Sequence, residues 1–146
     1  MNEKQSAHLF NTLNEYNNQP LEYGKRDCHL LFLTVYQYTD IMSKVKNRYT
    51  TIRGGLRVAS SLFNNGRIPY KNLDQILEHD FREIDTSGYL QLGDCVYNRE
   101  SHIMGIVTYD GIFMATLEDN CFTLNTWDIM DKNVLNGFRA FRKITK

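Results

Sequence analysis

The fold is decided by the stretch Tyr23-Gly24-Lys25-Arg26-Asp27-Cys28-His29-Leu30-Leu31. Gly24 supplies a turn, Asp27 is a good N-cap, and apolar residues follow, so the pattern predicts a helix beginning just after Asp27. Cys28 then falls in the first turn, where backbone N–H groups point outward and the helix dipole favours negative charge. A thiol placed there is expected to ionise more easily than a free thiol, and the thiolate is the nucleophilic form. Cys28 is therefore a candidate nucleophile, with a buried and unreactive cysteine as the alternative.

Helical patterns fill the N-terminal half of the chain. Helices are expected at residues 7–16, from 28 to about 43, from Thr50 or Thr51 to the Asn64-Asn65-Gly66 turn, and at residues 73–79. The second has a broad apolar surface, which suits a helix packed on two sides. Near the start of the third, Gly54-Gly55 either permits close approach of another backbone, such as the Cys28 helix, or marks a frayed helix start.

From Gly88 the apolar pattern changes to that of strands. Asp110-Gly111 is a strong hairpin signal between two apolar runs. Strands are expected at residues 94–97, 103–109, 112–117, 121–126 and 138–144. Helices followed by strands predict an α+β fold, in which N-terminal helices pack on an antiparallel C-terminal sheet.

Length and charge set the broad class. A chain of 146 residues with 42% hydrophobic residues is expected to form one domain, residues 1–146, in which residues 1–20 are an N-terminal helical extension. Seventeen basic residues balance seventeen acidic ones, which argues against nucleic acid or an anionic membrane as a partner. No apolar run reaches membrane-spanning length, and the polar first six residues show no secretory signal.

The three cysteines, Cys28, Cys95 and Cys121, have no paired spacing. A disulfide framework is therefore not expected, and no metal or cofactor is predicted, since neither a ligand cluster nor a phosphate loop is present. Cys95 and Cys121 fall in strand patterns and are expected to be core or sheet residues.

A cysteine nucleophile needs a base, which is usually histidine. His29 follows Cys28 directly, and adjacent helix positions diverge by about 100°, so it is not expected to serve its neighbour. His102 opens a predicted strand after a polar turn, which suits a base that a sheet presents to a helix end. An ordinary histidine at the end of a loop is the alternative interpretation.

The order of these motifs resembles the NlpC-type cell-wall peptidases, which are papain-like cysteine enzymes. The matching pieces are Asp27-Cys28, Gly93-Asp94, His102-Ile103-Met104-Gly105-Ile106-Val107 and Tyr109-Asp110-Gly111. In that family a cysteine on a helix faces a histidine on a sheet, and the enzymes cleave stem peptides of peptidoglycan. The resemblance implies a papain-like core with Cys28 as nucleophile and His102 as base.

The chain more closely resembles a small phage-associated branch of that superfamily, found among tail and virion genes. The branch has an aromatic-x-Gly-x-x-Asp-Cys motif, a Tyr-x-Thr/Ser-x-x-Gly-x-x-Arg motif, Gly-Asp, Gly-Ile-Val and a closing aromatic-Arg strand. This chain supplies them at residues 23–28, 49–57, 93–94, 105–107 and 138–142. The resemblance implies synthesis in the host cytoplasm, incorporation in the virion, and other virion or tail proteins as partners.

Two departures from the family pattern bear on catalysis. Active NlpC-type enzymes have the histidine two residues before the strand glycine, where this chain has Ile103. Because side chains alternate along a strand, His102 is expected to point to the opposite face unless a bulge intervenes. The third polar residue corresponds to positions near Met114 and Ala115, which cannot orient an imidazole, and Thr116 is a poor substitute.

Three functions follow from these observations. The first is a phage virion or tail component that keeps the fold with weak or lost catalysis, because general acid–base help is worth about two to four orders of magnitude. The second is an active cysteine peptidase or amidase acting on host peptidoglycan. The third is a binding module that holds a peptide or glycan in a cleft lined by Tyr23, Tyr49 and Trp127.

Overall fold

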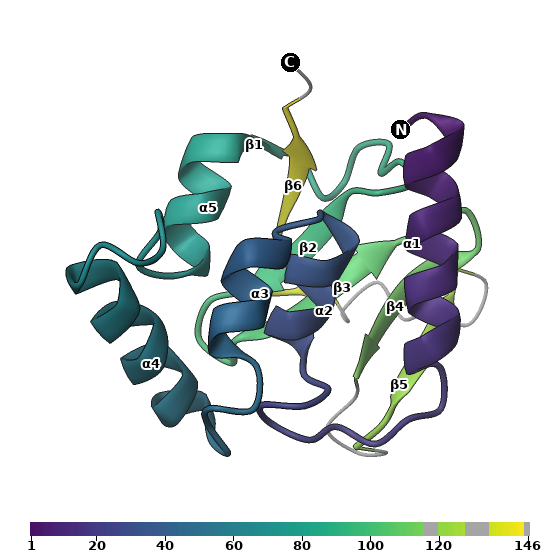
Figure 1. Ribbon diagram of the computed structural model, residues 1–146. Helices are drawn as coiled ribbons and strands as arrows, with labels where there is room; N and C mark the ends of the chain where they lie inside the picture. The colour runs from purple at the N-terminus through teal and green to yellow at the C-terminus, as the bar shows by residue number, and fades with distance from the viewer. Residues whose placement is uncertain (116–119, 128–134, 145–146) are drawn as a thin grey trace.

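The structure, a computed structural model, describes residues 1–115, 120–127 and 135–144 (Figure 1). The helices in these segments are α1 (Glu3–Tyr16), α2 (Cys28–Val35), α3 (Thr39–Val45), α4 (Ile52–Asn64) and α5 (Leu73–Asp80). The strands are β1 (Phe81–Ile84), β2 (Cys95–Asn98), β3 (Ile103–Val107), β4 (Gly111–Ala115), β5 (Phe122–Thr126) and β6 (Arg139–Lys143). The predicted α+β class is confirmed. The part of the predicted 112–117 strand at residues 116–117 lies outside the described residues.

The side chains before the helices explain where most helices begin. In each case an oxygen of the N-cap side chain accepts a hydrogen bond from the backbone N–H three residues on, which satisfies a donor that the helix leaves unpaired. The N-caps are Asn2, Asp27, Thr51 and Asn72. Asp27 is therefore the predicted cap of the Cys28 helix, and Thr51 is the cap of α4.

The predicted helix over residues 28–43 is wrong in its length, because α2 ends at Val35. Gln37 adopts a left-handed φ of 62°. The Gln37 N–H donates to the Thr34 carbonyl and the Tyr38 N–H to the Leu33 carbonyl, the pair of bonds that closes a helix in a Schellman motif. A separate helix, α3, then starts at Thr39.

All pairings within the sheet are antiparallel, and the strand order is β1-β6-β2-β3-β4-β5. The late strand β6 therefore lies between β1 and β2. Beside β5, the segment after α1 adds an isolated bridge between Pro20 and Cys121. This bridge and the packing of Leu9 and Leu13 in the main core join residues 1–20 to the rest of the fold.

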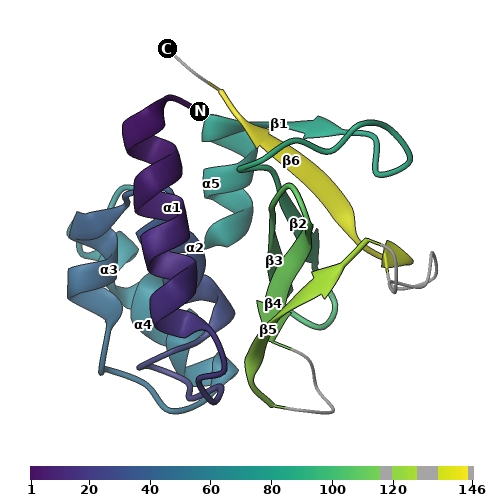
Figure 2. The same cartoon turned by 90° about the vertical axis from the view of Figure 1, so that its right-hand side faces the viewer.

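The helices cover one face of the sheet (Figure 2). The main core lies between them and includes Phe32 from α2, Ile76 from α5, and Met104 and Ile106 from β3. A second apolar cluster occupies the opposite face of the sheet, where Val96, Val107, Ile112, Met114 and Ala140 are buried. Strand β3 thus sends Met104 and Ile106 toward the helices and Ile103 and Val107 to the other face.

None of the helices in the described segments is long and apolar enough to cross a membrane.

Candidate functional site

Asp27 organises the start of α2. Its side chain is 3% exposed, and its Oδ1 accepts a hydrogen bond from the Leu30 N–H at 2.8 Å. Its Oδ2 accepts from the Gly24 N–H at 2.9 Å and from the Tyr49 hydroxyl at 2.5 Å. The carboxylate therefore closes the turn before the helix, caps the helix and binds the segment before α4.

Gly24 and Gly55 make room for Tyr49. A Cβ on Gly24, whose φ is +88°, would lie 2.0 Å from the Tyr49 carbonyl oxygen. A Cβ on Gly55 would lie 3.1 Å from the Tyr49 ring. The glycine pair at the start of α4 therefore makes room for the aromatic ring of Tyr49. The close backbone contact is made by Gly24, against the backbone of Tyr49. The hydroxyl of this same Tyr49 donates to Asp27, so the segment at residues 23–28 and the segment at residues 49–57 meet here.

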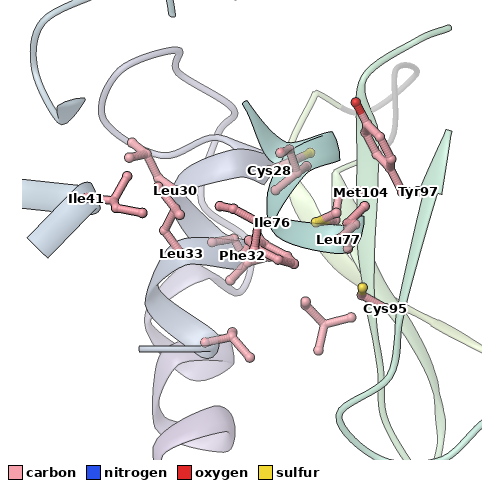
Figure 3. Packing of buried hydrophobic residues seen from close by; sticks show 14 of the residues in the cluster. Cys28, Leu30, Phe32, Leu33, Ile41, Ile76, Leu77, Cys95, Tyr97 and Met104 are labelled. Atoms are coloured by element: carbon pink, nitrogen blue, oxygen red, sulfur yellow. The ribbon is translucent and has the colours of Figure 1, made fainter. Parts of the chain in front are cut away.

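Cys28 is the first residue of α2, as predicted, and its side chain points toward the sheet (Figure 3). The backbone N–H groups of Met104 and Ala115 hydrogen bond to its sulfur. In the register of β3 and β4, Ile106 pairs with Phe113 and Val107 with Ile112, so Met104 would next lie opposite Ala115. The sulfur thus lies at a fork between these two strands.

The ionisation of Cys28 differs from the expectation. Burial raises the pKa of the Cys28 thiol to about 11, and the Asp27 carboxylate also raises it, while the N–H groups of Met104, Ala115 and Cys28 itself lower it. Loss of hydration outweighs these backbone donors, which come from the helix start and from β3 and β4. The prediction of an easily ionised thiol is therefore wrong.

His102 lies on the helix side of the sheet. Ile103 packs in the cluster on the other face, Met104 packs against the helices, and His102 lines a cavity together with Cys28. His102 precedes β3 and has a left-handed φ of 60°, so it belongs to the turn after β2. The expectation from strand alternation that it points to the opposite face is not met, because His102 lies in the turn, where alternation does not apply, and it lines the cavity with Cys28.

Two further side chains accompany His102. The Tyr97 hydroxyl lies 3.5 Å from His102 Nδ1, at the limit of a hydrogen bond, and the ring centroid of His29 lies 6.2 Å from that of His102. Burial lowers the pKa of His29, as does His102, while Asp27 and a hydrogen bond to the His102 backbone raise it. Tyr97 pairs with Met104 across β2 and β3, which brings its hydroxyl to this end of the sheet.

Sequence reasoning missed His29 and Tyr97. His29 was set aside because adjacent helix positions diverge. In the structure, however, Cys28 and His29 in the first turn of α2 both line the cavity. The signal for Tyr97 was available in the antiparallel pairing of residues 94–97 with the strand after His102. The positions expected for the third polar residue carry none: Met114 packs on the far face and Ala115 lies beside the Cys28 sulfur, while Thr116 lies outside the described residues.

The cavity beside Cys28 has a volume of about 200 Å³. Tyr23 and Tyr49 line it together with Cys28, His29 and His102. Burial raises the pKa of Tyr23, and so do the nearby Cys28 and Asp27.

The prediction that Trp127 lines this same cleft is wrong. Trp127 borders a separate hollow with Tyr89 and Tyr109, where its Nε1 donates to the Tyr109 carbonyl at 3.0 Å. The cause is the β4–β5 pairing, which sets Thr126 opposite Gly111 and so carries Trp127 to the β3–β4 hairpin.

The start of β2 and strand β6 meet at a buried ion pair. Arg142 donates from Nε to Asp94 Oδ1 at 2.9 Å and from a terminal nitrogen to Oδ2 at 2.8 Å. Asp94 is 2% exposed and also accepts from the Gln91 N–H. The Gly93-Asp94 motif before β2 is thus joined to the aromatic-Arg motif on β6. This contact stabilises the sheet and lies outside the cavity.

All three cysteines are free. Cys95 is buried on β2, where burial strongly raises its pKa, and Cys121 is half-buried beside Pro20. Within the described segments, no group of three or more His, Cys, Asp or Glu side chains is placed to hold a metal ion.

The fold and the site define an α+β protein in which a cysteine at a helix start faces an antiparallel sheet and shares a cavity with two histidines. Within that class, the chain belongs to the family described as a domain of unknown function (DUF6950), whose profile matches residues 2–131. Comparison with curated proteins gives no match, and comparison with solved structures gives none either.

Proposed function

We propose that this chain is a thiol hydrolase that cleaves an amide bond, with Cys28 as nucleophile and His102 as base. The observation that carries the proposal is that a cysteine in the first turn of α2 and a histidine just before β3 line one cavity. The resemblance to NlpC-type enzymes implies this arrangement, a papain-like core, and peptidoglycan stem peptides as the substrate class.

In the proposed reaction His102 first accepts a proton from Cys28 and then donates it to the leaving amine. The proton of the Cys28 thiol passes to a ring nitrogen of His102 while the sulfur bonds to the substrate carbonyl carbon. The carbon–nitrogen bond then breaks, and the amine leaves with the proton from the imidazolium. Water attacks the resulting thioester, the acyl group leaves as a carboxylic acid, and the sulfur regains a proton. Transfer coupled to attack suits a thiol whose pKa of about 11 disfavours a preformed thiolate.

Tyr97 and His29 support His102 in this proposal. The Tyr97 hydroxyl, 3.5 Å from Nδ1, restricts rotation of the His102 ring, and the His29 ring packs edge-on against it. They replace the polar residue that follows the hairpin in NlpC-type enzymes. Both are positioning residues, because neither needs to touch the reacting atoms.

Hydrolysis of purified peptidoglycan and of synthetic stem peptides, followed as newly released amino groups, tests the proposal. Cys28→Ala is expected to abolish release, and Cys121→Ala is the matched control that leaves it unchanged. His102→Asn is expected to slow release by about 10²–10⁴-fold, because asparagine tolerates the left-handed φ but is not a base. A wild-type protein without activity, or a fully active Cys28→Ala variant, would contradict the proposal.

The second candidate is a non-catalytic virion or tail component, and the burial of Cys28 favours it. A cysteine 8% exposed with a raised pKa has the properties of a structural residue. Particles purified from a phage that encodes this chain are then expected to contain it by mass spectrometry. Particles with Cys28→Ser are expected to assemble and infect normally, whereas an essential hydrolase would lose infectivity with intact particle assembly.

A further inference from the structure

Most side chains that line the cavity beside Cys28 are apolar, although Tyr70, Asn72 and Ser101 also border it. Its lining away from Cys28 comes from the helical layer and includes Leu33, Val45, Leu56, Ala59, Leu73 and Ile76. Asp27 is the one charged side chain among the described lining residues besides the two titratable histidines. Both of its oxygens already accept hydrogen bonds from Leu30, Gly24 and Tyr49.

The apolar face of α4 is left incompletely packed beside this space. Helix α4 lies at the edge of the helical layer (Figure 1), and its one fully buried residue is Leu62. Ile52, Leu56 and Ala59 point into the cavity lining and are only half-buried. An apolar helix face that borders empty space next to a candidate nucleophile is the expected form of a pocket for an apolar group.

The volume limits the size of that group. An engineered apolar cavity of about 150 Å³ stays dry and binds benzene. The cavity here, about 200 Å³, therefore has room for one branched aliphatic or aromatic side chain. A carboxylate in it would lose its hydration and meet no cationic side chain in the described lining, so acidic groups are disfavoured.

We infer that this cavity is a specificity pocket for one uncharged, leucine- or phenylalanine-sized side chain next to the bond that Cys28 attacks. The inference rests on the proposed function for the attack itself, whereas binding in the pocket does not require catalysis. It predicts that, among the peptides that the protein cleaves, one with an apolar residue at the cleaved bond is preferred.

Binding to the Cys28→Ala protein separates the pocket from the chemistry. The probes are the N-acetyl amides of leucine, phenylalanine, glutamate and glycine, titrated at pH 7 and followed by NMR shifts of cavity residues. The leucine and phenylalanine probes are expected to bind at least tenfold more tightly than the other two. Equal affinities for leucine and glutamate, or no binding of any probe, would overturn the inference.

Two substitutions on α4 locate the binding. Ala59→Leu extends into the cavity and is expected to weaken the leucine probe at least tenfold, while Ser61→Leu on the exposed side of the same helix leaves it unchanged. If Ala59→Leu lowers the melting temperature, the smaller Ala59→Val replaces it. Equal effects of the substitutions at 59 and 61 would place binding elsewhere and overturn the inference.

Cleavage assays distinguish the two failures. Selective apolar binding by a wild-type protein that cleaves no peptide would remove the proposed function and leave the pocket standing. Cleavage that depends on Cys28 but shows no preference between leucine and glutamate at the bond would remove the pocket and leave the function standing.

Discussion

The Tyr49 hydroxyl donates a hydrogen bond to the buried Asp27 carboxylate at 2.5 Å, across 22 residues of sequence. Through this contact the segment before α4 holds the cap of the helix that carries Cys28. The same carboxylate accepts from Gly24 and Leu30, so the geometry of the candidate nucleophile depends on one fully hydrogen-bonded side chain.

Removing that hydroxyl is expected to destabilise the protein. Tyr49→Phe removes one of the two donors to Oδ2 of the buried Asp27 carboxylate and leaves only the Gly24 N–H there, which is expected to cost about 1–3 kcal/mol in the free energy of unfolding. Urea denaturation measures the change. Tyr109→Phe, on an exposed tyrosine, is the control and is expected to change nothing. Equal stability of the Tyr49→Phe and wild-type proteins would show that water replaces the hydroxyl.

Two arginines on β6 make a matched comparison. Arg142→Ala leaves the Asp94 carboxylate, 2% exposed, buried without its partner and is expected to cost about 3–5 kcal/mol. Arg139 pairs with Glu83 on the surface, so Arg139→Ala is expected to cost at most about 1 kcal/mol. Chemical denaturation of both variants gives the difference, and similar losses would mean that burial of Asp94 does not decide the energy.

Gly24 is expected to tolerate no side chain. In Gly24→Ala the new Cβ would lie 2.0 Å from the Tyr49 carbonyl oxygen, so the loop and α4 cannot both keep their positions. Gly66→Ala is the control, because Gly66 has a similar φ of +73° with open space around it and should cost about 1–2 kcal/mol. Circular dichroism melting is expected to show a much larger loss for residue 24, and equal losses would contradict the steric account.

Alkylation of Cys28 is expected to be slow at neutral pH. With a folded-state pKa of about 11, about one molecule in ten thousand carries the thiolate at pH 7, and the fraction rises about tenfold per pH unit until near 11. Mass spectrometry of iodoacetamide-treated native protein measures the rate at Cys28. In urea the rate is expected to level off near the ordinary thiol pKa of 9.0. A native rate that levels off below pH 8 would contradict this prediction.

Local backbone structure was predictable from the sequence where a few adjacent residues specify it. The Asp27 cap and the Asp110-Gly111 hairpin are each specified by a few adjacent residues, and both are present. The end of α2 was not predictable, because tertiary contacts hold Gln37 in its left-handed conformation. The neighbouring Tyr36 and Tyr38 hydroxyls donate to the Gly93 carbonyl and to Asp80.

Strand β1 and the arrangement of the candidate site could not be predicted for the same kind of reason. Strand β1 follows α5 directly, without a turn signal, and its four residues become a strand only because β6 pairs with them. Strand β3 begins at Ile103, as predicted, but His102 before it has a left-handed φ of 60°, which strand alternation does not describe. The cavity joins residues from across the chain, so no local pattern contained it.

The place of β6 inside the sheet sets an order for folding during synthesis. Until the ribosome has released residue 143, β1 and β2 have no strand between them, and both present open edges to other chains. The arginine that neutralises Asp94 arrives on that same strand. A nascent chain stalled before this point is therefore expected to be prone to aggregation and to need chaperone protection.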